Sequence, residues 1–85
     1  MRKLARRGGR MKVVRYNLAH YLDTHGITRY QLAQRTGIQY HIIDDYYKNR
    51  VTRLDTGNLG RILDALDCRL EDILTVDEIE ENIKQ

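Results

Sequence analysis

The sequence contains no proline, no tryptophan and no phenylalanine, and it has a single cysteine, Cys68. One cysteine cannot form a disulfide within the chain, which fits a reducing compartment, and we expect a cytoplasmic protein. No apolar run approaches the roughly 20 residues that a membrane-spanning helix needs, so we expect no membrane partner. The basic N-terminus is not followed by an apolar segment, so the sequence predicts no secretory signal. The 85 residues suffice for one small domain without a large internal cavity.

The charges are separated along the chain, although the formal net charge is only +3. Residues 1–15 carry seven basic residues and no acidic one, whereas residues 71–85 carry six acidic residues and one lysine. We therefore expect a flexible basic N-terminal arm over residues 1–12 and an acidic C-terminal tail over residues 77–85 that can form a helix. Such a separation favours a polyanionic partner at the basic end.

The basic arm has a second explanation, and the sequence leaves both open. The run Arg6-Arg7-Gly8-Gly9-Arg10 directly precedes Met11, and purine-rich codons for Arg and Gly resemble a translated ribosome-binding site. If Met11 is the native start, residues 1–10 are leader, and the remaining chain has ten basic and twelve acidic residues, a net charge of −2. The functional interpretation therefore does not depend on the arm.

Apolar residues recur with the period of an α-helix, which predicts an all-α domain of five helices over residues 13–76. Gly26 and Gly37 are typical of the left-handed residues that end helices, and Thr28 with Gln31 matches a capping box. Asp55 is a good N-cap for the fourth helix. The predicted helices cover about 14–24, Thr28 to Gly37, 39–48, 56–66 and 69–75.

The tract from Thr28 to Tyr46 has the spacing of a helix-turn-helix. Ala33 is small enough for the third helix to cross the second closely, and Gly37 permits the turn between them. The outward face of the third helix can then enter a DNA major groove about 12 Å wide. The apolar positions that hold this helix from inside are Ile38, Ile43 and Tyr46.

This tract resembles the Xre-type (phage repressor or Cro-like) helix-turn-helix domain, most clearly in Leu32-Ala33-x-x-Thr36-Gly37-Ile38. The segment from Leu54 to Leu74 is similar to the closing half of the same domain. The resemblance covers about residues 14–75 and is closest to the small single-domain bacterial members. It implies a five-helix phage-repressor-like fold and a DNA-binding transcriptional regulator.

The resemblance also implies roles for individual residues, because phosphate contacts give affinity and base contacts give specificity. Arg29 corresponds to a phosphate contact at the start of the second helix. The third helix supplies base- and backbone-reading positions, and the loop after it usually touches phosphate. The residues of the third helix are Gln39, Tyr40, His41, Asp44 and Asp45, and those in or near the loop are Lys48, Arg50 and Arg53.

Two features depart from the family's pattern. Gln39 stands where a Ser or Thr cap is common, and the pair Asp44-Asp45 is unusual on a surface that faces a polyanion. One carboxylate can accept a hydrogen bond from cytosine. We favour the alternative in which Asp44 pairs with Lys48 at i+4 and neither carboxylate reads a base. A third possibility is that this helix binds a protein.

Other residue types give no sign of catalysis or of a metal site. His20, His25 and Cys68 lack the tight spacing of zinc ligands, and no base is placed to activate a nucleophile. We therefore expect no enzyme, no metal, no cofactor and no small-molecule ligand. Cys68 is expected to be a small core residue, and Tyr47 is expected to pack against the fourth helix.

We expect a sequence-specific regulator, a repressor that binds an operator in double-stranded DNA as a homodimer, with helix 39–48 in the major groove. Val76, Ile79 and Ile83 would form an apolar stripe on a helical tail, which can bury against its own domain or against a second subunit. The alternative is a protein-interaction module, antitoxin-like or an adaptor, that uses the same fold with an acidic recognition surface.

Overall fold

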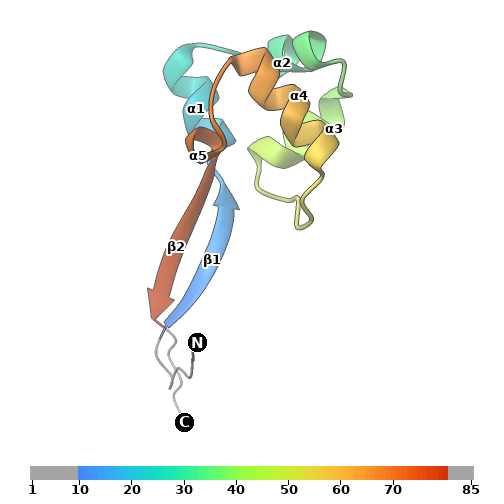
Figure 1. Ribbon diagram of the computed structural model, residues 1–85. Helices are drawn as coiled ribbons and strands as arrows, with labels where there is room; N and C mark the ends of the chain where they lie inside the picture. The colour runs from blue at the N-terminus through green and yellow to red at the C-terminus, as the bar shows by residue number, and fades with distance from the viewer. Residues whose placement is uncertain (1–9, 81–85) are drawn as a thin grey trace.

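The computed structural model describes residues 10–80 and contains five helices and two strands within them. The predicted arm before residue 10 and the end of the predicted tail, with Ile83, lie outside the described residues. The helices form one body, from which the two strands project together as a ribbon (Figure 1). The elements are β1 (Arg10–Tyr16), α1 (Leu18–His25), α2 (Arg29–Thr36), α3 (Tyr40–Tyr47), α4 (Thr56–Leu66), α5 (Leu70–Ile73) and β2 (Leu74–Glu80).

Local signals fix the ends of the first helices, as the sequence predicts. Gly26 and Gly37 both adopt left-handed backbone, with φ of 67° and 76°, directly after α1 and α2. The capping box at α2 is complete, since the backbone N–H of Gln31 donates to Thr28 Oγ1 at 3.0 Å and that of Thr28 donates to Gln31 Oε1 at 2.9 Å. Asp55 likewise accepts from the backbone N–H of Asn58 at 3.0 Å and starts α4.

The core lies where all five helices meet, and every helix contributes at least one buried apolar side chain. Burying such a side chain stabilises the fold by about 1.5–3 kcal/mol relative to leaving it exposed. Tyr46 of α3 meets Tyr16 of β1 edge to face, with ring centroids 5.0 Å apart. The largest fully buried side chains are Leu18, Leu22, Leu32, Ile43, Tyr46, Ile62 and Ile73.

The prediction of an all-α fold is wrong in one respect, because β1 and β2 form a two-stranded antiparallel sheet. The register runs from Arg10 opposite Glu80 to Tyr16 opposite Leu74. The first helix therefore begins at Leu18 and not near residue 14, and α5 ends at Ile73. Residues 10–12 of the predicted flexible arm pair with residues 78–80 of the predicted helical tail, so both are strand there.

The base of the ribbon is fastened to the loop between α3 and α4. Asn49, which has a left-handed φ of 59°, accepts from the backbone N–H of Tyr16 at 2.9 Å and donates to its carbonyl at 2.6 Å. The hydroxyl of Tyr16 donates to the carbonyl of Arg53 at 3.3 Å. These bonds couple the end of α3 to β1, so the two elements keep a fixed relation.

Candidate DNA-binding surface

The turn between α2 and α3 is built from small, buried or hydrogen-bonded groups. Ala33 and Ile38 are buried, and Gly37 donates its N–H to the carbonyl of Ala33 at 2.9 Å. Thr36 Oγ1 donates to the carbonyl of Leu32 at 2.8 Å and accepts from the N–H of Ile38 at 3.1 Å. The turn therefore holds α3 against the body by its inner side, where Ile43 and Tyr46 are buried.

The N-terminal end of α3 is open. Gln39 occupies the N-cap position with extended backbone, φ −63° and ψ 146°, and its side chain makes no capping hydrogen bond. Gln39, Tyr40 and His41 are all exposed. The first backbone N–H groups of a helix lack partners within it, and they favour negative charge such as a phosphate. The departure at Gln39 thus leaves an uncapped helix end beside three exposed polar side chains.

Asp44 lies between two cations. Arg29 at the start of α2 forms an ion pair with it through one carboxylate oxygen, and Lys48 Nζ lies 3.1 Å from the other. The hydrogen bonds with Lys48 and then Arg29 hold the pKa of Asp44 below its ordinary value, against the opposing effect of burial. The same contact raises the pKa of Arg29. The predicted i,i+4 pair of Asp44 with Lys48 is confirmed.

Arg29 is fixed from its other sides by aromatic rings. Its guanidinium carbon lies 4.4 Å from the centre of the Tyr47 ring and 5.9 Å from that of Tyr40. Tyr47 in turn donates its hydroxyl to the carboxylate of Asp23 at 2.8 Å. The polar and ring contacts of Tyr47 thus join α1 and α2, while its predicted packing against the fourth helix stays a prediction.

The cations around Asp44 offset its negative charge on this surface. One carboxylate is matched by two cations, so the group of Arg29, Asp44 and Lys48 carries a net positive charge. Only 18% of the Asp44 side chain is exposed, compared with 45% for Lys48. A polyanion that approaches α3 therefore meets the ammonium of Lys48 more readily than the carboxylate.

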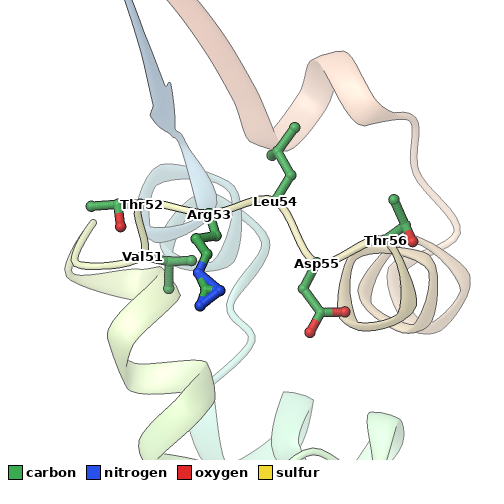
Figure 2. Close-up of a pocket in the computed structure, with 6 residues that line it drawn as sticks. All are labelled: Val51, Thr52, Arg53, Leu54, Asp55 and Thr56. Carbon is green, nitrogen blue, oxygen red and sulfur yellow. The ribbon is translucent and has the colours of Figure 1, made fainter.

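The loop after α3 supplies the remaining predicted cations. Arg50 reaches back to Asp45, with 3.7 Å between Nη1 and the carboxylate oxygen, and the Arg50 side chain is 62% exposed. Arg53 is exposed and forms no ion pair with any other described residue. In Figure 2 Arg53 and Asp55 point to the same side of the loop, and Leu54 points to the opposite side. The loop thus presents its charges and its apolar residue in different directions.

Of the nine residues predicted to touch DNA, the structure joins five into two bonded groups. Arg29, Asp44 and Lys48 form one group, and Asp45 with Arg50 forms the other. Tyr40 borders the first group through Arg29. Gln39 and His41 lie beside it at the open end of α3, and Arg53 stands apart on the loop.

Sequence reasoning missed three residues that position this surface. Tyr47 packs on Arg29 and is itself bonded to Asp23, and Asn49 fixes the end of α3 to β1. The left-handed φ of Asn49 has a recognisable signal, because Asn is the commonest residue after Gly in that conformation and it follows directly on α3. The pairing of Asp23 with Tyr47 joins residues 24 positions apart and has no local signal.

The residues considered for a metal site do not gather. Within residues 10–80 no group of three His, Cys, Asp or Glu side chains is placed to hold a metal ion. His25 stacks on Tyr21, with ring centroids 4.0 Å apart, and burial raises the pKa of the Cys68 thiol. Over the same residues, no helix has both the length and the apolar character needed to span a membrane.

A helical body with a tight α2–α3 turn, an exposed α3 and cations around it defines the class of helix-turn-helix DNA-binding proteins. The model of the Cro/C1-type helix-turn-helix DNA-binding domain matches residues 17–78, and the chain belongs to this family. The Xre-type resemblance drawn from the sequence is thereby confirmed, and the protein is a DNA-binding transcription regulator. No curated protein and no solved structure matches the chain.

Proposed function

We propose that the protein is a transcriptional repressor that binds an inverted-repeat operator as a homodimer, with α3 in the major groove of each half-site. The observation that carries this proposal is the open end of α3, where Gln39, Tyr40 and His41 are exposed beside the net-positive group of Arg29, Asp44 and Lys48. Side chains at this end reach base edges in helix-turn-helix proteins, and the cations set the register on phosphate.

Within the proposal the residues divide by role. Gln39 and His41 have the donors and acceptors for base edges, while Lys48, Arg50 and Arg53 contact phosphate. Arg29 acts mainly by holding Asp44 and only secondarily on phosphate, since both its charge and its face are engaged. We assign no base contact to Asp44, because each of its oxygens already pairs with a cation and only 18% of its side chain is exposed.

The alternative of a protein-interaction module that uses an acidic surface finds less support. It needs Asp44 and Asp45 to face a basic partner, yet each already lies beside a cation of its own chain. We also propose that the chain acts by binding and not by catalysis, since the one thiol is made less acidic by burial and a nucleophile needs the opposite.

The test is a fluorescence-anisotropy titration of the 85-residue chain against the DNA upstream of its own gene, with a scrambled duplex as competitor. We expect the affinity for the specific duplex to exceed that for the scrambled duplex by about 10³-fold or more, and the affinity to fall steeply with salt. Arg53→Glu should weaken binding to both duplexes, whereas Arg61→Glu on the exposed side of α4 is the matched charge control and should not.

Three results would contradict the proposal. Equal weak binding to both duplexes would leave only a general attraction to polyanions. Equal effects of Arg53→Glu and Arg61→Glu would mean that the loop after α3 does not touch DNA. Loss of a basic partner protein on Asp45→Lys, with no DNA binding by the unchanged chain, would favour the interaction module instead. A parallel titration of the chain that starts at Met11 shows whether the first ten residues contribute.

A further inference from the structure

The β1–β2 ribbon leaves apolar side chains in water. Four of the large apolar residues that are exposed in the described chain lie on it: Val14 at 58% and Val76 at 60% on one face, and Met11 at 46% and Ile79 at 50% on the other. Only its base, at Tyr16 and Leu74, packs against the helices. An isolated two-stranded ribbon is marginally stable in water unless a further surface covers it.

One face of the ribbon continues into a hollow beside the helical body. Val14 lies directly opposite Val76, and both are on the side that carries Tyr16, because side chains alternate along a strand. Next to them the loop after α3 contributes Val51 and Leu54, and Leu54 is 63% exposed. Leu54 points away from Arg53 in Figure 2, so this apolar surface is separate from the charges of the loop.

The charges of the ribbon limit the classes of partner that can cover it. On β1 the described side chains include Lys12 and Arg15, and on β2 they include Asp77 and Glu78. Lys12 is opposite Glu78 on the face that carries Val14, and Arg15 Nε lies 3.0 Å from Asp77 on the other face. The two signs balance, so DNA or an anionic membrane would meet as many carboxylates as cations. The Val14–Val76 face of a second ribbon carries Lys12 and Glu78 side by side, so each can lie beside the residue of opposite charge on the first ribbon.

We propose that two copies of this chain associate through their β1–β2 ribbons. The Val14–Val76 face of each ribbon packs against the same face of the other, and the end of each ribbon lies near the hollow at Val51 and Leu54 of the other copy. An interface formed by one surface with itself is the usual arrangement of a symmetric dimer. This inference rests on the proposed function in one respect only: the operator of a small domain requires a pair. The association itself is measured without DNA.

The size of the ribbon sets the expected strength. Seven residues at about 3.3 Å each make it about 23 Å long, and two strands are about 10 Å wide. Two such faces outline about 460 Å² together, which is below the roughly 1,200–2,000 Å² that specific, stable interfaces bury. The dimer is therefore weak in the absence of DNA, with dissociation in the micromolar range.

The test is sedimentation equilibrium of the 85-residue chain without DNA, from about 1 to 200 μM, a range that brackets a micromolar constant. We expect the mass to rise from 10.1 kDa toward twice that value. Val14→Lys and Val76→Lys should remain monomers throughout. Tyr30→Lys, which replaces a residue that is 61% exposed on α2, is the matched control and should associate as the unchanged chain does.

Amide exchange of the unchanged chain covers the case in which a ribbon variant does not fold. We expect the backbone amides of β1 and β2 to become more protected as concentration rises, while those of α2 do not. A monomer at every concentration, dimers that persist in both lysine variants, or ribbon exchange that is independent of concentration would overturn the inference. Failure of the proposed function would instead appear as an intact dimer that binds no DNA.

Discussion

Asn49 joins the end of α3 to β1, and its replacement separates two physical effects. Its side chain makes two hydrogen bonds to the backbone of Tyr16, at 2.9 and 2.6 Å, and its φ is 59°. Each bond contributes about 0.5–1.5 kcal/mol. A Cβ-bearing residue without a local hydrogen bond costs about 1 kcal/mol in left-handed backbone. Asn49→Ala should therefore lower the free energy of unfolding by about 2–4 kcal/mol.

The comparison with Asn49→Gly isolates the backbone contribution. Glycine loses the same two hydrogen bonds but tolerates the left-handed φ, at the cost of a more flexible unfolded chain. We expect it to be more stable than Asn49→Ala by about 0.5–1 kcal/mol and less stable than the unchanged chain.

Urea unfolding followed by far-ultraviolet circular dichroism measures all three proteins. They are compared at one concentration, since association shifts apparent stability. In a domain of this size 1 kcal/mol corresponds to about 4–8 °C in Tm, so heating gives an independent value. The reasoning is refuted if Asn49→Ala is as stable as the unchanged chain, or if the glycine variant is the less stable of the two.

Three further predictions concern the cap, the core and the ion pair. Thr28→Ala removes the acceptor of the capping box at α2 and should cost about 1 kcal/mol by urea unfolding, whereas Thr28→Ser should cost much less. Ile43→Ala creates a cavity beneath α3 and should cost about 2–5 kcal/mol, and an unchanged denaturation midpoint would contradict the burial of Ile43. The pKa of Asp44 is lowered in the fold, so its pairing stabilises the protein above about pH 4, the ordinary carboxyl pKa, and this contribution is lost as the pH falls through the lower folded value. Stability measured from pH 7 down to about pH 2 should therefore decline less in Asp44→Asn than in the unchanged chain, and parallel curves would exclude the effect.

The parts of the fold that sequence could predict are those with local causes. Gly26, Gly37 and the Thr28–Gln31 box mark helix ends through the residues at those ends, and each was found where predicted. The apolar positions of α4 likewise face inward because a single helix sets their spacing. The pair of Asp44 and Lys48 belongs to the same kind, since four positions along a helix bring two side chains together.

The parts that sequence missed depend on partners far along the chain. The spacing of Val14 to Leu18 favours a helix, whereas its β-branched side chain favours a strand. Only the pairing with Val76 decides that Val14 lies in a strand. The spacing of Val76 and Ile79 predicts a helical stripe, and it misleads for the same reason. The place of Tyr47 depends on Asp23 and Arg29, which belong to two other helices. In the candidate site, the ion pair of Arg29 with Asp44 could not be predicted from the sequence, because it joins residues of two different helices, α2 and α3.

The pairing of β1 with β2 has a consequence for how the chain folds during synthesis. Arg15 and Thr75 are bonded neighbours although 60 positions separate them, so β1 leaves the ribosome long before its partner exists. Helices α2 and α3 pack on each other across a short turn and can form early, whereas closing such a long loop is entropically costly and slow. The ribbon is therefore expected to be the last element to form. A newly made chain would then pass through a stage in which its helix-turn-helix is already folded while the ribbon, the surface proposed for association, has not yet formed.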